Sequence, residues 1–235
     1  MSSDIYIFKR VEKKYFLNPE QVKMLLDKIG HLVIPDSHGE STICSLYLDT
    51  PDNLLIRNSI DAKVYKEKLR LRSYGTPGKE DRVFLEIKKK LKGVVYKRRI
   101  SLPLNEAMEY ISTLEKPFDS QIMREIDYAM HFYKHPLPKM LVAYRRMAYF
   151  AEDIPTLRIT FDSDVRYRTN QLDLSLGDEG IRIIPPDKTI MEIKTDGAMP
   201  LWLSEALDEC KIFPTSFSKY GTSYKHNLTN KEFKL

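Results

Sequence analysis

The 235-residue chain is long enough for one large domain or two small ones, and a hydrophobic content of 42% is sufficient for a real core. Its formal net charge of +5 is modest, so charge alone indicates neither a nucleic-acid-binding nor a membrane-surface protein. Low-complexity segments and internal repeats are absent, which argues against linkers and solenoids. We therefore expect a single domain over residues 1–235.

Membrane insertion and cysteine chemistry are also disfavoured. No stretch approaches the roughly 18 apolar residues of a membrane helix, and the start, MSSDIYIFKR, has no apolar signal core. We therefore expect a cytoplasmic protein. Cys44 and Cys210 lie far apart without CxxC or histidine spacing, which argues against a zinc site or a disulfide framework and predicts two buried thiols.

The predicted elements alternate between a few helices and many strands. The first helix starts at Asn18-Pro19-Glu20, because Asn is a good cap and Pro suits the first helical position. Further helices are predicted at 105–114, 120–132 and 203–210. Alternating β-branched and aromatic residues predict strands at 4–16, 41–49, 60–74, 82–91, 94–102, 139–150, 156–167 and 189–196, with loops at 74–82 and 177–188. This order predicts an α+β fold, an eight-stranded antiparallel β-barrel with peripheral helices.

Charged residues recur on one face of seven of these strands. In KLRLRSYG, Arg70 and Arg72 oppose Leu69 and Leu71, because alternate residues of a strand point to opposite faces. The commonest cause of such alternation is a sheet with one solvated face. The alternative is a lumen, which would repel itself when empty and would therefore hold a polyanion. The cations on these faces are Lys14, Arg70, Arg72, Lys88, Lys97, Arg99, Arg146, Arg158 and Lys194.

Four carboxylates share these faces, namely Glu12, Glu86, Asp162 and Glu192. Each either pairs with a neighbouring Lys or Arg or helps to hold a hard divalent cation that bridges phosphates. Glu86 and Glu192 are the best metal candidates, because each stands in an E-I-K triplet whose lysine could bind a phosphate oxygen at the same site.

The predicted hairpin at residues 84–103, FLEIKKKLKGVVYKRRISLP, makes the division of faces explicit. If the strands line a lumen, four of its charged residues point inward and three outward. The inward set is Glu86, Lys88, Lys97 and Arg99, and the outward set is Lys89, Lys90 and Arg98.

Nine motifs in order resemble one family. They are RVEKKYFLNPEQ, SLYLDTPDN, KLRLRSYG, FLEIKKK, YKRRISL, YRRMAYF, LRITFDSDVRYR, IMEIKTDGAMP and SFSKYGTSY. Any one is weak, but the ordered series resembles the VTC polyphosphate polymerase domain of the bacterial stand-alone type, within the triphosphate tunnel metalloenzyme superfamily.

That resemblance implies an eight-stranded tunnel in which basic residues bind ATP phosphates and polyphosphate while acidic residues bind Mn²⁺ or Mg²⁺. The matching positions for phosphate contact are Lys14, Arg70, Arg72, Lys88, Lys97, Arg99, Arg146 and Arg158, with Lys219 closing one end. Nucleotide binding falls on Arg70, Arg72, Lys88, Arg146, Arg158 and Lys194. Glu192 is the implied metal ligand, with Glu86, Glu12 and Asp162 as further candidates.

Two positions depart from related patterns. The hydrolytic CYTH branch begins with E-x-E-x-K, whereas Arg10 occupies the first position here, which favours the polymerase branch and removes one metal carboxylate. The polymerase family often carries a second basic residue near the SK motif, and Ser216 takes its place here.

The predicted function is transfer of the γ-phosphoryl group of ATP to a growing polyphosphate chain. Two alternatives remain, a tunnel triphosphatase acting on tripolyphosphate or nucleoside triphosphates, and a non-catalytic polyphosphate-binding module. No nucleic-acid partner is expected, because the charged faces are cation-dense but poor in aromatic residues. The sequence leaves open the oligomeric state and a membrane partner protein that receives the product.

Overall fold

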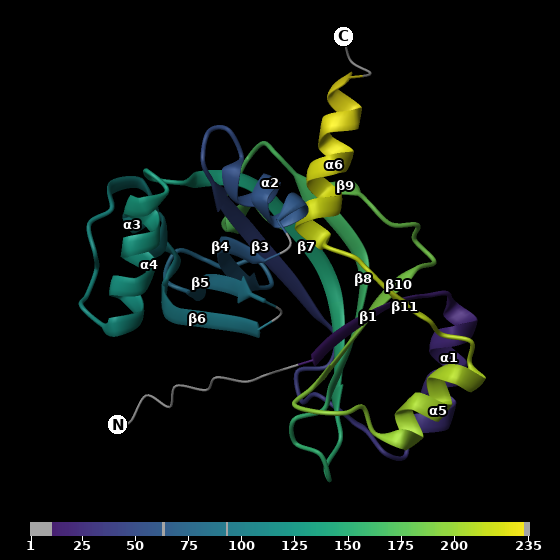
Figure 1. Ribbon diagram of the computed structural model, residues 1–235. Helices are drawn as coiled ribbons and strands as arrows, with labels where there is room; N and C mark the ends of the chain where they lie inside the picture. Colours follow the sequence, from purple (N-terminus) through teal and green to yellow (C-terminus); the bar gives the residue numbers. More distant parts are fainter. Residues whose placement is uncertain (1–10, 63, 93, 233–235) are drawn as a thin grey trace.

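The computed structural model describes residues 11–62, 64–92 and 94–232 (Figure 1). Six α-helices lie in it, α1 (Pro19–Ile29), α2 (Leu54–Asp61), α3 (Leu104–Thr113), α4 (Gln121–Phe132), α5 (Leu201–Glu209) and α6 (Lys219–Glu232). The long strands are β1 (Val11–Leu17), β3 (Ser41–Asp49), β4 (Tyr65–Tyr74), β5 (Arg82–Leu91), β6 (Val94–Pro103), β7 (Leu137–Phe150), β8 (Arg158–Arg168) and β10 (Thr189–Thr195). Two-residue strands β2 (Ile34–Pro35), β9 (Ile181–Arg182) and β11 (Pro214–Thr215) and a 3₁₀ turn (Leu174–Leu176) complete the described elements.

Two of the four predicted helix starts coincide with side-chain caps, and the helices predicted from 105 and 203 begin at Leu104 and Leu201 without one. The side chain of Asn18 accepts a hydrogen bond from the Gln21 backbone N–H, and the Gln21 side chain accepts one from the Asn18 backbone N–H. These reciprocal bonds satisfy two donors that the first turn of α1 would otherwise leave free. The Ser120 hydroxyl caps α4 by accepting a single hydrogen bond from the Met123 N–H. The predicted strand at 4–16 is confirmed only from Val11, since residues 4–10 lie outside the described residues.

The sheet is antiparallel throughout but is not a closed eight-stranded barrel. Its described strands run in the order β11-β1-β10-β8-β7-β3-β4-β5-β6, with β2 on β7 and β9 on β8. The barrel prediction is therefore wrong in its closure and in its number of strands, although eight of the strands are long. One physical reason lies at β1, whose second edge pairs with β11 at Lys14 and Tyr15, so that β6 cannot pair with it there.

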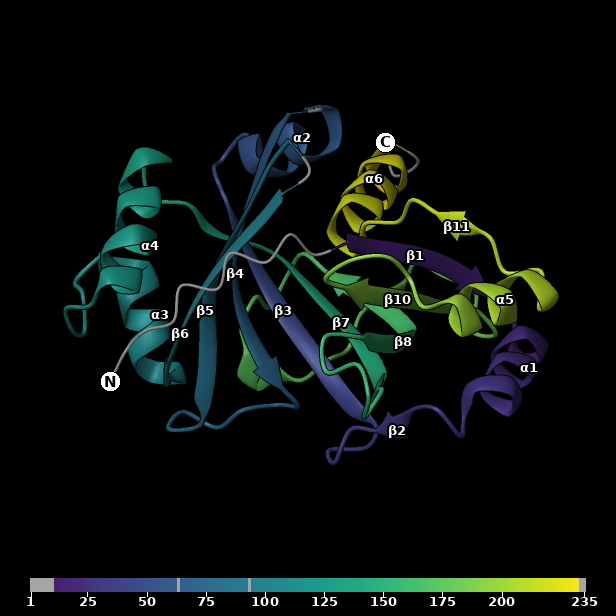
Figure 2. The same ribbon diagram turned by 60° about the horizontal axis from the view of Figure 1, so that its bottom comes forward.

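The open sheet bends into two wings that face each other (Figure 2). One wing consists of β4, β5 and β6, whose outer face packs on α3 and α4 through a core that includes Leu69, Leu85 and Ile126. The other consists of β1, β8 and β10, whose outer face packs on α1 and α5 through a second core that includes Ile159 and Ile193. Helices therefore cover the apolar faces, and the alternate residues of the same strands point into the space between the wings.

Helices α2 and α6 were not among the predicted elements. The predicted strand at 60–74 begins only at Tyr65, and α2 lies just before it. The start of α2 is fixed by Asp49, whose carboxylate accepts hydrogen bonds from the Leu55 and Ile56 N–H groups. The same carboxylate accepts a bond from the Tyr220 hydroxyl of α6. A third core, including Ile43, Tyr144 and Tyr167, also contains Ile56 of α2 and Tyr220 of α6, so both helices pack on it.

Both cysteines are free and buried, as predicted. Among the described residues, no helix has the length and apolar character that crossing a membrane requires.

Candidate anion-binding site

The space between the wings is lined by many more cations than carboxylates. We call this inner surface the charged face. Its cations are Lys14, Lys68, Arg70, Arg72, Lys88, Lys97, Arg99, Arg146, Lys194 and Lys219. Its carboxylates are Glu12, Glu86, Asp162 and Glu192. All four predicted carboxylates and eight of the nine predicted strand cations are thus brought together, with the positive charges well in excess.

Glu86 is the centre of the first ion-pair group, on β4, β5 and β6. Arg70 donates to it at 2.7 Å, Lys97 lies 2.6 Å from its other oxygen, and Arg99 lies 3.9 Å away. Burial opposes ionisation of Glu86, but Arg70, Arg72 and Lys97 lower its pKa to about 2. Two of the predicted inward residues of the hairpin, Lys97 and Arg99, therefore meet Glu86 as expected.

Asp162 is the centre of a second group on the opposite wing. Arg146 of β7 donates two hydrogen bonds to its carboxylate, at 2.6 and 2.7 Å, and Lys219 of α6 donates a third at 2.5 Å. Asp162 is fully buried, and Lys219 and Arg146 lower its pKa despite that burial. Such a bidentate pair fixes the guanidinium in one orientation.

A third group surrounds Lys14 of β1. Its amine lies 3.4 Å from Glu12 and 3.3 Å from Glu192 and donates to the backbone oxygen of Phe217. Lys194 lies 3.0 Å from Glu192. Burial opposes ionisation of Glu192, but Lys194, Lys219 and Lys14 hold its pKa well below the usual value.

One ion pair joins the two wings directly. Lys88 of β5 lies 3.6 Å from Glu12 of β1, although these strands are far apart in the order of the sheet. Side chains, rather than strand pairing, therefore bring the wings together at this point.

Arg72 differs from its neighbours because no carboxylate lies within ion-pair distance of it among the described residues. Its guanidinium makes only long hydrogen bonds, 3.4 Å to the Ser45 hydroxyl and 3.5 Å to the Tyr144 hydroxyl. Ser45 and Tyr144 were not predicted as site residues, nor was Tyr47, whose hydroxyl accepts a bond from Arg70. Burial opposes ionisation of Tyr47, but Arg70, Lys68 and Arg72 lower its pKa to about 8.

Lys68 is the cation that the prediction missed. It stands two residues before Arg70 on β4, so strand alternation alone could have placed it on the charged face. Its amine donates to the Ser218 hydroxyl at 3.2 Å.

Arg158 is the predicted cation that does not join these groups. It alternates onto the same side of β8 as Asp162, but its guanidinium is half exposed and pairs with Asp36, 3.0 Å away, beyond the edge of the charged face. Lys89 and Arg98 point outward, as predicted for them. Lys89 pairs with Glu67, and Arg98 pairs with Glu125 of α4. The outward prediction is wrong for Lys90, which alternates onto the same side of β5 as Glu86 and Lys88 and is exposed near the end of the strand.

The fit of the charged face to a divalent metal depends on Glu12 and Glu192. Among the described residues no group of three His, Cys, Asp or Glu side chains is placed to hold a metal ion. Magnesium and manganese bound to phosphates, however, need only one or two carboxylates from the protein. Glu12 and Glu192 share Lys14, and beside Glu192 the buried Thr160 has a hydroxyl that makes no hydrogen bond to any described residue. Each of the four carboxylates is paired with at least two cations, but among the described residues only Glu12 and Glu192 share a lysine, and Glu192 lies beside this hydroxyl, so this donor set fits one such ion best.

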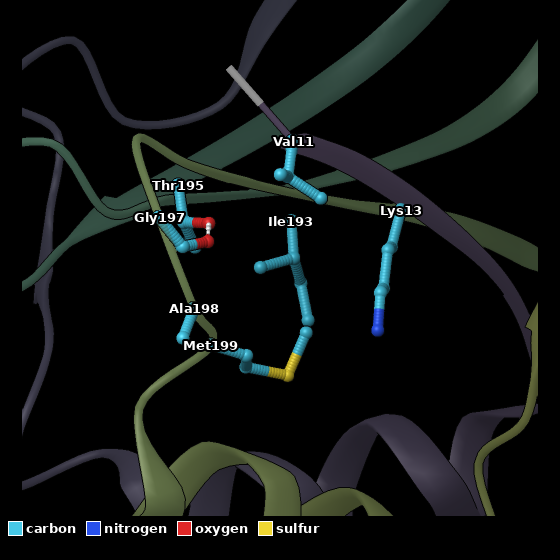
Figure 3. Close-up of a pocket in the computed structure, with 7 residues that line it drawn as sticks. All are labelled: Val11, Lys13, Ile193, Thr195, Gly197, Ala198 and Met199. Atoms are coloured by element: carbon cyan, nitrogen blue, oxygen red, sulfur yellow. Dashed lines mark hydrogen bonds between the residues drawn. The ribbon is translucent and has the colours of Figure 1, made fainter. Parts of the chain in front are cut away.

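A pocket lies on the other side of β1 and β10. It has a volume of about 360 Å³, and its lining is mostly apolar, with Lys13 as its one charged residue (Figure 3). Lys13 and Ile193 alternate with the residues of the charged face, so this pocket is separate from the anion site.

Comparison with known proteins places the chain in a family. The VTC domain family matches residues 9–227. The chain belongs to the VTC domain family. No curated protein matches the sequence. A solved structure from Bacillus halodurans, described as a candidate adenylate cyclase, is similar in fold, with a TM-score of 0.55 at 14% identity over 89% of this chain and 93% of that one. A second candidate adenylate cyclase, from Vibrio parahaemolyticus, gives a TM-score of 0.48 at 11% identity over 92% and 98% of the two chains.

Membership in the VTC domain family confirms the relationship that the nine motifs indicate and supports a function related to polyphosphate or triphosphate. Of the two departures, Arg10 lies outside the described residues, and Ser216 lies in an exposed position between β11 and α6. The basic residue that often occupies this region in VTC polymerases is therefore replaced here by an uncharged side chain at the surface.

Proposed function

We propose that this VTC domain is a polyphosphate polymerase that transfers the γ-phosphoryl group of ATP to the end of a polyphosphate chain held on the charged face. The observation that supports this proposal is the composition of the charged face, where ten cations stand against four carboxylates. Such an excess costs free energy in the empty protein, and a bound polyanion relieves it.

Phosphoryl transfer requires positioning and charge neutralisation more than covalent participation by the protein. In this proposal Arg70, held by Glu86, and Arg146, held by Asp162, present guanidinium groups in fixed directions. Arg72, which has no carboxylate partner among the described residues, is free to turn its full charge to a phosphate. Lys97, Arg99, Lys88 and Lys219 would extend the contacts along the chain.

The metal has a defined place in this proposal. Glu192 and Glu12 would hold one Mn²⁺ or Mg²⁺ together with phosphate oxygens, and when bound the ion would neutralise charge on the transferred group. Lys14 and Lys194, which both pair with Glu192, would then keep the acceptor and donor phosphates near these carboxylates. Arg158, which pairs with Asp36 and is half exposed, is given no phosphate contact in this arrangement.

One assay separates the candidate activities. The purified chain is incubated with ATP and Mn²⁺, products are resolved on a gel stained for polyphosphate, and free phosphate is measured in parallel. Long chains support the polymerase, orthophosphate without chains indicates a triphosphatase, and tight polyphosphate binding without turnover indicates a binding module. Glu192→Ala should abolish metal-dependent turnover and retain some phosphate affinity, and full turnover by this variant would disprove the metal assignment.

A further inference from the structure

Lys68 is a cation of the charged face without a carboxylate partner among the described residues. Its hydrogen bond runs to the uncharged hydroxyl of Ser218. Burial and the neighbouring cations Lys88, Lys14 and Arg70 lower its pKa to about 8, although Tyr47 acts in the opposite direction. In the empty protein these contacts do not offset the burial of the amine, so the charge of Lys68 favours an incoming anion.

The position of Lys68 relative to two other lysines indicates a phosphoryl group as the anion that binds there. Lys68 of β4 and Lys88 of β5 are cross-strand partners. Lys14 of β1 and Lys88 both lie within ion-pair distance of Glu12, and Lys14 and Lys68 donate to the adjacent residues Phe217 and Ser218, so the three amines come from both wings to one place. They meet where Lys88 and Glu12 already bridge the wings. Three amines can surround one phosphoryl group, because its oxygens accept several charged hydrogen bonds at once.

We propose that Lys68, with Lys14 and Lys88, forms a phosphoryl subsite at the junction of the wings, and that a phosphoryl group bound there replaces Ser218 as the partner of Lys68. This inference rests on the proposed polyanion function and adds to it one binding residue and one location. The ligand is a terminal or internal phosphoryl group of a polyphosphate or nucleoside triphosphate. A phosphoryl group bound there would connect the wing of β4 and β5 to the wing of β1. No strand pairing connects β1 directly to β4 or β5.

The surroundings of Lys68 also predict how the subsite responds to pH. The groups that act on it are Tyr47 of β3, Lys14 of β1, Arg70 of β4 and Lys88 of β5. As pH rises through about 8, Lys68 loses its proton and Tyr47, whose pKa is also about 8, gains negative charge. Both changes weaken the attraction for a phosphoryl group, and phosphate binding near neutral pH keeps Lys68 protonated.

The test measures binding of inorganic tripolyphosphate to the full chain by titration calorimetry, near pH 7 and near pH 9.5. Lys68→Met should weaken binding near pH 7 by about tenfold or more, the effect of losing one charged hydrogen bond. Lys68→Arg should bind like the wild type near pH 7 and lose less affinity near pH 9.5, because guanidinium stays charged. The matched control is Lys13→Met, which removes a lysine from the opposite face of β1 and should bind as tightly as the wild type.

The outcomes separate this inference from the proposed function. If Lys68→Met binds like the wild type while Arg72→Met binds weakly, the Lys68 subsite is wrong and the polyanion function stands. If Lys68→Arg loses affinity with pH as steeply as the wild type, the role of the Lys68 proton is wrong. If the wild type does not bind tripolyphosphate, the proposed function fails, and the inference fails with it. The melting temperature of empty Lys68→Met should not fall, since the variant removes an unfavourable charge, and this shows that weaker binding is not unfolding.

Discussion

Arg72 is the residue whose replacement tests anion binding most directly. No described carboxylate lies within ion-pair distance of Arg72, and Glu86 keeps Arg70 and Lys97. Arg72→Met therefore orphans no buried charge and should change the unfolding free energy little. Tripolyphosphate affinity should fall by about tenfold or more, measured by calorimetry. Arg145→Met is the control, because Arg145 is exposed and pairs with Glu40. Equal losses in both variants would point to general surface charge rather than to the charged face.

Asp162 should behave in the opposite way. Asp162→Asn removes the partner of two buried cations, Arg146 and Lys219, and should destabilise the fold by about 3 to 5 kcal/mol, measured by urea unfolding. Asp36→Asn is the control, because its partner Arg158 is half exposed. This substitution should lower the unfolding free energy by at most about 1 kcal/mol. A small effect at Asp162 would mean that water or another group already screens this pair.

The ion pairs of Glu86 predict that the unfolding free energy falls at acid pH. The pKa of Glu86 in the folded protein is about 2, below the ordinary 4.5, so its ion pairs stabilise the fold above about pH 4.5. That stability is lost as pH falls towards 2, because the carboxylate must then take up a proton. Glu86→Gln should therefore flatten the decline in unfolding free energy between about pH 4.5 and 2, measured by denaturant unfolding at each pH. An unchanged slope would contradict the assigned ion pairs.

At the scale of elements, Asp49 connects β3, α2 and α6. Its buried carboxylate accepts from the Leu55 and Ile56 N–H groups and from the Tyr220 hydroxyl, and Tyr220 stacks on Tyr47 with ring centroids 4.0 Å apart. Asp49→Ala should cost about 3 kcal/mol of unfolding free energy, because it leaves buried donors without partners. Tyr220→Phe keeps the stacking and removes one bond, so its cost should be about 1 kcal/mol. Equal costs would show that only the α6 contact matters.

The same elements show which strands and helices a sequence pattern predicts and which it does not. The predicted bounds of β3 and β5 match the structure. In the middle of β5, residues of a helix-covered face alternate with residues of the charged face, whereas β3 is buried on both faces between two apolar cores and is recognised by its β-branched and aromatic residues. Helix α6 is polar along most of its length, so it offered no apolar stripe to predict. Helix α2 is short, and its start depends on Asp49, a residue that the strand pattern assigns to β3.

At the scale of the whole molecule, the empty charged face should become less unfavourable as pH rises. Burial and neighbouring cations lower the pKa of Lys68 and of Lys97 to about 8, against 10.5 for a free lysine. Between about pH 8 and 10.5 the unfolded chain therefore binds more protons than the folded one, and these groups make stability rise with pH. Tripolyphosphate should raise the melting temperature most near neutral pH and less near pH 9.5, measured by thermal scans with and without the ligand. A ligand effect that grows with pH would contradict the proposal.

The sequence by itself determined the family, most of the strands and which residues share a face, because these depend on local alternation and on ordered motifs. It could not determine that the sheet stays open, since closure depends on which edges pair, and β11 occupies an edge of β1. It could not separate Arg158, which Asp36 draws to the rim, from Arg146, which Asp162 holds inside. Tertiary structure alone decided which cations lack a carboxylate, because the partners of Lys68 and Arg72 come from residues distant in the chain.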